Sequence, residues 1–253
     1  MRLPDFIIAG APRSGTTWLY RLLDRHPDIY MAKPLAPEPK FFLVDDLYRR
    51  GLEHYSRTWF AGIESRRRCG EKSTNYLENP AAAERIARHL PEVKLIFILR
   101  EPTSRAFSNY LWSRMNGLED QDFAAALELE ATRELNVPER LRYARPHAYF
   151  SRGLYAKMLT PWIERFPREN LFVVRYEEII HRPRLLARRL HLFLEVPSRP
   201  GDCLDLGEVN PSEKAGIEMP EAVRRRLRKA YRRPNQDLAR LLELDFDIWE
   251  TRR

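Results

Sequence analysis

The chain has 253 residues, 43% of them hydrophobic, so it can bury a sizeable core and is not disordered throughout. No apolar run approaches the roughly 20 residues that span a membrane. We expect no signal peptide, because the short apolar run near the start passes directly into a glycine-containing turn. Two cysteines, Cys69 and Cys203, exclude a disulfide-rich scaffold and a multi-cysteine zinc site. They leave open one long-range disulfide or two free thiols.

The net charge is +8, the difference between 44 basic and 36 acidic residues. Only seven of the basic residues are lysine, so 37 are arginine (44 minus 7). Arginine binds phosphate and sulfate through two parallel hydrogen bonds and keeps its charge. The composition is therefore compatible with an anionic ligand, although a lineage-wide arginine bias would give the same excess.

The first predicted unit is a strand at 5–10, a glycine-containing loop and a helix from 16 that stops before Pro27, in which apolar residues recur at helical spacing. The prolines of 31–45 preclude a regular helix there. The remaining predicted elements are a short amphipathic helix at 54–63, a strand edge and loop at 69–77, a helix at 81–90, a strand at 93–100, a helix containing 106–112, helices and loop covering the core at 113–150, a helix at 151–167, a strand at 170–179, a basic amphipathic helix at 182–196, a loop at 198–220 and a helical segment at 220–249.

Strands that alternate with helices, and whose two faces are both apolar, predict an α/β fold with a central parallel sheet flanked by helices. The chain shows no repeat and no low-complexity linker, so 1–253 is predicted to form a single domain. Ligands of such sheets bind at the carboxyl ends of the strands. The site is therefore expected between the segments that follow the strands at 5–10 and 93–100.

The segment from Gly10 to Thr17, GAPRSGTT, joins the first strand to the first helix. Backbone N–H groups in such a turn, at the positive end of a helix dipole, form a site for an anion. The spacing is similar to the nucleotide-binding P-loop, but Thr16 stands where that loop has its lysine, and the positive charge lies at Arg13. A nucleoside or sugar kinase is the alternative, and the missing lysine argues against it.

A second cluster, Arg100-Glu-Pro-Thr-Ser-Arg with Ser108 further on, follows the strand at 93–100. An arginine at a strand end and a serine in the first turns of the next helix could hold a second phosphate. A surface ion pair within Arg-Glu-Pro would account for the same residues.

Together these segments resemble the sulfotransferase superfamily, which uses 3′-phosphoadenosine 5′-phosphosulfate (PAPS). APRSGTTWL is similar to its P-loop-like 5′-phosphosulfate loop, and FILREPTSRAFSNY to its 3′-phosphate element. PEPKFF, GEKSTNYL, the SRGLY segment and the C-terminal PEAVRRRLRKAYRRPNQDLARLLELDFDIW resemble the heparan sulfate branch. The resemblance covers nearly the whole chain in order, with residues 113–148 the least matched.

The resemblance implies a set of residues that bind PAPS. Those for the 5′-phosphosulfate are Arg13, Ser14, Gly15, Thr16 and Thr17. Those for the 3′-phosphate are Arg100 and Ser108. Gly153 and Tyr155 match positions that line the nucleotide, and Lys214 lies in a late loop where the branch places a basic contact to PAPS.

Three residues match positions with a catalytic role in this branch. Glu38 matches the carboxylate used as general base, although Pro37 precedes it where the branch usually has lysine. Lys72 matches a lysine near the substrate and the sulfuryl group. Arg13 stands where most members carry a catalytic lysine. A guanidinium does not give up its proton, so the expected role of Arg13 is to neutralise charge on the leaving group.

The resemblance implies transfer of the sulfuryl group from PAPS, in line, to a hydroxyl or amine of a carbohydrate or glycosylated acceptor. The two positive charges would neutralise the leaving group, and no metal is expected. A non-catalytic polyanion-binding protein is a further alternative, which depends on the net charge and the arginine-rich stretches at 182–189 and 224–233.

The expected partner is a small-molecule or glycan acceptor, with neither nucleic acid nor a membrane span. Its pocket would be built from 31–45, 50–60 and 113–150. A cytoplasmic bacterial protein is expected from the arginine usage and from the lack of an anchor or signal. The oligomeric state is left open.

Overall fold

A computed structural model of the chain describes residues 1–63, 67–203, 206, 216–244 and 249. The chain divides into two compact units. The first, called here the sheet unit, comprises residues 1–99 and 161–209, and the second, the helical unit, comprises residues 100–160 and 210–253. A single domain over 1–253 stays a prediction.

The sheet unit is built on five parallel strands in the order β2-β3-β1-β4-β5. The strands are β1 (Phe6–Gly10), β2 (Ile29–Met31), β3 (Arg68–Lys72), β4 (Lys94–Leu99) and β5 (Leu171–Arg175). All of β1 is buried, because it has a strand on each side and helices over both faces. The predicted α/β class and central parallel sheet are confirmed. β2, only three residues long, is an addition to the predicted strands.

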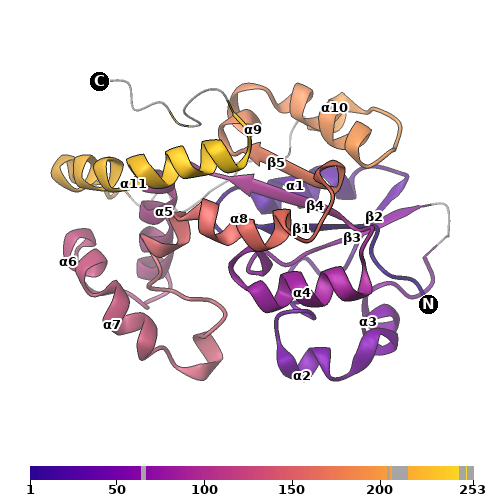
Figure 1. Ribbon diagram of the computed structural model, residues 1–253, viewed down its shortest axis with the longest axis horizontal. Helices are drawn as coiled ribbons and strands as arrows, with labels where there is room; N and C mark the ends of the chain where they lie inside the picture. The colour runs from indigo at the N-terminus through magenta and orange to yellow at the C-terminus, as the bar shows by residue number, and fades with distance from the viewer. Residues whose placement is uncertain (64–66, 204–205, 207–215, 245–248, 250–253) are drawn as a thin grey trace. The chain divides into compact units, whose positions relative to one another are not determined.

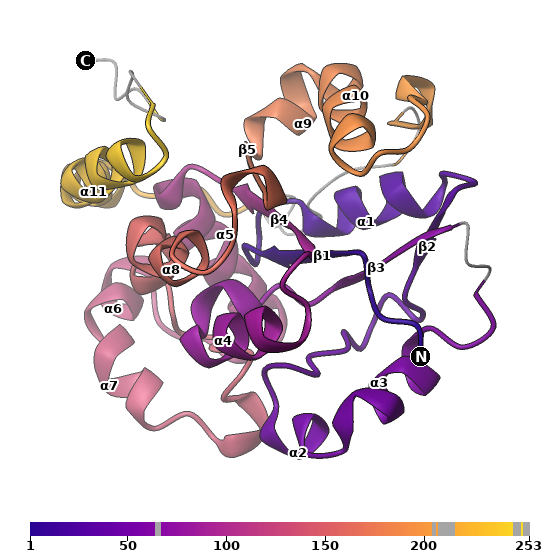
Figure 2. The ribbon, with the colours of Figure 1, turned by 45° about the vertical axis from the view of Figure 1, so that its right-hand side comes forward.

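Helices flank this sheet on both faces (Figures 1 and 2). One face carries α1 (Thr16–Asp24), α9 (Glu177–His181) and α10 (Pro183–Phe193), which share a core cluster with β1, β4 and β5. The opposite face carries α4 (Pro80–His89), and there the rings of Phe97 and Trp162 meet edge to face, with centroids 5.3 Å apart. Side chains alternate along a strand, so Ile96 and Ile98 of β4 join the α1 cluster while Phe97 faces the other way.

The segment from 31 to 44 forms no regular helix, as its prolines predict, and it leads into α2 (Asp45–Tyr48) and α3 (Gly51–Trp59). Four aromatic rings pack where this segment meets α3 and β3. The rings are those of Phe41, Phe42, Tyr55 and Tyr76, with Phe41 stacked on Tyr55 at 4.4 Å. This packing fixes the end of the proline-containing segment against the sheet unit.

The helical unit contains α5 (Pro102–Met115), α6 (Phe123–Glu128), α7 (Glu130–Leu135) and α11 (Glu221–Leu241). α8 (Tyr155–Ile163) runs from this unit into the sheet unit. α5, α6 and α11 bury a cluster of their own that includes Tyr110, Phe123, Tyr149 and Tyr231. The segment 113–150, predicted as helices and loop covering the core, thus contributes to a second core.

Some predicted boundaries differ from the structure. Of the helical segment predicted at 220–249, α11 forms the part from Glu221 to Leu241, 242–244 are not helical, and 245–248 lie outside the described residues. The helix predicted at 54–63 is α3, which starts at Gly51. Cys69 is buried and is a free thiol in the structure as described. Within the described ranges, none of the helices combines the length and the apolar composition that a bilayer crossing requires.

Candidate functional site

The loop between β1 and α1 has two left-handed residues, Arg13 (φ 66°) and Gly15 (φ 87°). A Cβ on Gly15 would lie 2.7 Å from Cδ1 of Ile179 and 2.9 Å from the ring of Tyr176, so only glycine fits there. Arg13 adopts a backbone conformation that costs energy for a residue with a side chain. Strain of this kind is found mainly at functional sites, which supports a functional role for the loop.

α1 begins at Thr16 with Gly15 as its N-cap, and in the described structure no side chain accepts a hydrogen bond from its first turn. The first N–H groups of any helix lack partners within the helix, and they lie at its positive end. Ser14 and Thr16 are buried beside them, and Thr17 is half-buried. The predicted 5′-phosphosulfate residues therefore form a turn with the chemistry of an anion site.

Glu38 and Lys72 form an ion pair in the sheet unit. Thr74 donates to the same carboxylate from its backbone N–H, at 3.1 Å, and from its hydroxyl, at 3.2 Å. The side chain of Lys72 is 7% exposed and that of Glu38 14%. β3 ends at Lys72, so the pair lies at the carboxyl edge of the sheet, where ligands of parallel sheets bind.

Glu71, the neighbour of Lys72, is fully buried. Burial raises the pKa of its carboxyl to about 7. The hydroxyls of Tyr55, Tyr76 and Ser73 lower that pKa in part, and the charge of Glu38 raises it further. A group that titrates near neutral pH beside candidate catalytic residues is a candidate for a functional role itself.

Arg100 and Ser108 line one pocket of the helical unit, with a volume of about 160 Å³. Arg100 is 7% exposed and Ser108 1%. Among the described residues, the Ser108 hydroxyl has no hydrogen-bond partner, which is costly for a buried polar atom. The other residues of the pocket are Ser104, Phe107, Leu111, Ile217, Met219 and Arg224. A cationic pocket with an unsatisfied hydroxyl fits a phosphate group.

The first turn of α5 is already capped by a side chain. Glu101 accepts from the N–H groups of Thr103 and Ser104, at 3.0 and 2.7 Å, and from the Ser104 hydroxyl at 2.8 Å. The end of this helix is therefore satisfied internally. An anion in the neighbouring pocket would be held by the side chains of Arg100 and Ser108.

Tyr155 and Gly153 have supporting positions in the helical unit. The Tyr155 hydroxyl donates to the backbone carbonyl of Arg100 at 2.8 Å. A Cβ on Gly153 would lie 2.6 Å from the ring of Tyr231, so a larger residue would displace α11 or that ring. Neither residue lines the Arg100 pocket as described. Lys214, the remaining predicted donor contact, lies outside the described residues.

The structure thus assembles two groups of predicted residues, Glu38 with Lys72 in the sheet unit and Arg100 with Ser108 in the helical unit. Three further residues, Thr74, Glu71 and Arg224, were not among the predicted site residues. Thr74 and Glu71 flank Lys72 in GEKST, so their nearness to the site is readable in the sequence. Arg224 lies on a distant helix, and no local pattern connects it with Arg100.

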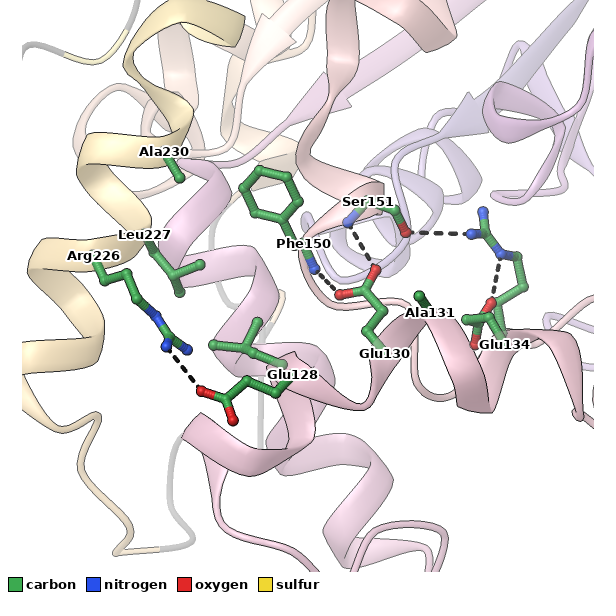
Figure 3. A pocket seen from close by; sticks show the side chains of 11 residues that line it. Glu128, Glu130, Ala131, Glu134, Phe150, Ser151, Arg226, Leu227 and Ala230 are labelled. Carbon is green, nitrogen blue, oxygen red and sulfur yellow. Dashed lines mark hydrogen bonds and ion pairs between the residues drawn. The ribbon is translucent and has the colours of Figure 1, made fainter.

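A larger pocket of about 610 Å³ lies elsewhere in the helical unit (Figure 3). Leu127, Phe150 and Leu227 form apolar parts of its wall. Glu130 accepts from the backbone N–H groups of Phe150 and Ser151, at 2.6 and 2.9 Å, so its charge is satisfied by the backbone. The predicted site residues do not line this pocket.

The sulfotransferase domain family matches residues 3–208, most of the chain. The chain belongs to the sulfotransferase family. The resemblance to the sulfotransferases is therefore confirmed. The family assignment argues against the kinase alternative.

A relative from Caenorhabditis elegans, bifunctional heparan sulfate N-deacetylase/N-sulfotransferase 1, is 28% identical over 262 residues. The match covers 95% of this chain and 30% of the relative, so the chain spans less than a third of that protein's length. A solved sulfotransferase from Alicyclobacillus acidocaldarius is 29% identical, with a TM-score of 0.79 and coverage of 98% of this chain and 99% of the other. Mouse sulfotransferase SULT7A1, solved in complex with PAP, shares the fold at 21% identity and a TM-score of 0.52, covering 88% of this chain and 70% of that one.

The roles of individual site residues stay predictions, as does the absence of a metal. The described residues contain no group of three or more His, Cys, Asp or Glu side chains placed to hold a metal ion.

Proposed function

We propose that this protein transfers the sulfuryl group of PAPS to a hydroxyl or amine of a carbohydrate or glycosylated acceptor. The observation that carries the proposal is the carboxylate of Glu38, held by Lys72 and Thr74 at the carboxyl edge of the sheet. The C. elegans relative is named for sulfation of heparan sulfate, which supports a glycan acceptor.

Glu38 is the general base in this proposal. Its carboxylate takes the proton of the acceptor hydroxyl or amine as the oxygen or nitrogen forms its bond to sulfur. The bond between sulfur and the bridging oxygen breaks, and that oxygen leaves as part of the 5′-phosphate of PAP. The Lys72 ammonium, the Thr74 backbone N–H and the Thr74 hydroxyl all contact the carboxylate, which fixes its direction. Partial exposure of Glu38 gives an acceptor access to it.

Arg13 and Lys72 supply the positive charge that the reaction needs. Negative charge grows on the bridging oxygen as the bond to sulfur breaks, and a cation placed there lowers the barrier. Arg13 is in the loop whose N–H groups would bind the 5′-phosphosulfate, with Ser14, Gly15, Thr16 and Thr17. Arg100 and Ser108 would bind the 3′-phosphate, the group that distinguishes PAPS from adenosine 5′-phosphosulfate.

The proposal also states the acceptor, the metal requirement and the cellular compartment of the enzyme. The acceptor is a glycan or a small glycosylated molecule, and the reaction needs no metal, so a chelator should leave turnover unchanged. We infer a cytoplasmic bacterial enzyme from the arginine-rich composition alone. Cell fractionation followed by immunodetection tests that compartment.

A transfer assay with the variant Glu38→Gln tests the proposal. Glutamine keeps the shape but does not take up the proton, so kcat should fall by about 10²- to 10⁴-fold with labelled PAPS and a panel of amine and hydroxyl glycans. The affinity for PAP should change by less than about twofold, because Glu38 does not bind the donor.

The matched control is Glu84→Gln on α4, where an exposed glutamate pairs with Arg88. This variant should keep the kcat of the wild type. If Glu38→Gln also keeps it with the same acceptor, Glu38 is not the base. Phosphate transfer from ATP and Mg²⁺ at a rate comparable to sulfate transfer from PAPS would overturn the assignment of PAPS as the donor.

A further inference from the structure

Glu71 is a buried carboxyl that the proposed reaction does not use. It lies on β3 next to Lys72, and because side chains alternate along a strand the two point to opposite faces of the sheet. Lys72 contacts Glu38, whereas Glu71 faces the aromatic cluster around Tyr55 and Tyr76. A buried carboxyl is unfavourable unless hydrogen-bond partners compensate for the lost water. The partners of Glu71 therefore bear on its role.

One hydroxyl group connects Glu71 with the segment that carries Glu38. The Ser73 hydroxyl donates to Glu71 at 3.1 Å and accepts from the backbone N–H of Lys40 at 2.9 Å. The Tyr76 hydroxyl accepts from the backbone N–H of Phe42 at 3.2 Å, in the aromatic cluster that surrounds Glu71. The carboxyl thus orients the Ser73 hydroxyl so that it accepts from the backbone just beyond Glu38.

We propose that Glu71 is a positioning residue for Glu38: through Ser73 it holds the backbone at Lys40, and thereby the direction of the Glu38 carboxylate. This inference rests on the proposed role of Glu38 as base. Lys40 has a left-handed backbone (φ 49°), so the chain turns sharply just after Glu38, and a turn of this kind needs fixed partners.

The ionised form of Glu71 is the form that holds the segment. An ionised carboxylate only accepts hydrogen bonds, and the hydroxyls that face it come from Tyr55 on α3 and from Ser73 and Tyr76 after β3. The charge of Glu38 also acts on Glu71, and it raises the pKa of that carboxyl. Burial raises the pKa of Glu71 to about 7, so its proton is lost and gained in the neutral range.

Two pH dependences with opposite signs follow. The positioning weakens as the pH falls through about 7, because protonated Glu71 loses acceptor capacity, so turnover should fall on the acid side of 7. The folded-state pKa lies above the usual value of 4.5, so the stability linked to this group is present at low pH and is lost as the pH rises through 7.

The variant Glu71→Gln tests this positioning role, because its amide has one acceptor oxygen and does not titrate. We expect kcat to fall about tenfold, because the hydrogen bond that orients the Ser73 hydroxyl is weakened. The KM for PAPS should stay within about twofold of the wild-type value. The acid limb of kcat near pH 7 should disappear, and so should the fall in stability as the pH rises through 7.

The control is Glu119→Gln in the helical unit, where another buried glutamate accepts from Arg133 and Tyr149. This substitution also alters a buried carboxyl, but it should leave both the acid limb of kcat and the KM for PAPS unchanged. A merely structural role for Glu71 predicts that the two variants behave alike.

Amide hydrogen exchange gives a readout that does not depend on turnover. The N–H group of Lys40 should exchange about tenfold faster in Glu71→Gln, and also in Ser73→Ala, which leaves the carboxyl in place. If Glu71→Gln fails to fold, Ser73→Ala alone decides the outcome. Unchanged exchange at Lys40 and an unchanged acid limb overturn the positioning role. Wild-type turnover in Glu38→Gln would instead overturn the role of Glu38 as general base. Because amide exchange at Lys40 does not depend on turnover, it would show separately whether Glu71 positions the segment.

Discussion

Two of the helices that start shortly after a strand, α1 and α5, satisfy their first turns differently. α1 follows β1 through the loop with Arg13, and in the described structure no side chain caps it. α5 follows β4, and the carboxylate of Glu101 accepts from two of its N–H groups. The first terminus keeps its partial positive charge available to a ligand, and the second has it neutralised.

The difference indicates how two anionic groups on one donor would be held. Where the helix terminus is open, backbone N–H groups can bind the group that reacts, and a strained backbone shapes the turn. Where the terminus is closed, side chains have to bind the other group, and the pocket of Arg100 and Ser108 contains a buried hydroxyl without a described partner. The first arrangement is shaped by backbone conformation and the second by side-chain chemistry.

Of the changes at these two helix termini, removing the charge at the open terminus should have the largest effect. Arg13→Ala should lower kcat by about 10²- to 10³-fold, because charge that develops on the leaving oxygen loses its partner. The affinity for PAP should fall by less than about tenfold, since the backbone N–H groups of the loop remain. Steady-state kinetics and calorimetry with PAP measure the two quantities.

Arg13→Lys is the companion variant. Lysine is the usual residue of the resembling family at this position, so the variant should keep most of the turnover. Turnover as low as in Arg13→Ala would show that the guanidinium acts through its shape. Loss of PAP binding in Arg13→Ala would break the comparison, because the open terminus would then bind nothing without the side chain.

The sequence predicts the open terminus well and the closed pocket less well. The loop with Arg13 and Gly15 is continuous in sequence, and its turn chemistry follows from local residue types. Arg100 and Ser108 are near each other in sequence, so their pairing was also predictable. Arg224, by contrast, joins the pocket through the packing of α11, which only the folded chain determines.

The same limit applies to Glu38 and Glu71. Resemblance alone placed Glu38 among the catalytic residues, and nothing local shows that it meets Lys72, 34 positions away, or Thr74. The buried position of Glu71 depends on Tyr55 of α3 and on the register of β3 against β1. A glutamate beside a lysine in a sequence is by default exposed to solvent, and the burial of Glu71 reverses that expectation.

The next largest effect is expected at the pocket of Arg100 and Ser108, beside the capped start of α5. Arg100→Ala should weaken binding of PAP roughly 10- to 150-fold, which corresponds to about 1.5–3 kcal/mol for a charge-assisted contact. Binding of AMP, which lacks the 3′-phosphate, should change by less than about twofold. Calorimetry with both nucleotides separates the 3′-phosphate from the rest of the ligand.

Ser108→Ala tests the contribution of the hydroxyl in the same pocket. It removes the buried hydroxyl without removing charge, so the loss of PAP affinity should be about two- to tenfold. Equal losses for PAP and AMP in both variants would show that the pocket does not bind the 3′-phosphate.

The smallest expected effect comes from opening the closed terminus. Glu101→Ala removes the cap of α5 and leaves N–H groups of its first turn without their carboxylate, which should lower the free energy of unfolding by about 1 kcal/mol. Urea denaturation measures this loss, and Glu128→Ala, which changes an exposed glutamate on α6, should cost less.

If the 3′-phosphate is held by side chains, saturating PAP should add the same stability to wild type and Glu101→Ala, since linkage depends only on the affinity of the folded state. A larger gain in the variant would mean that the uncapped N–H groups of α5 take part in binding. The two termini would then differ only in the presence of Glu101, and not in how they can bind an anion.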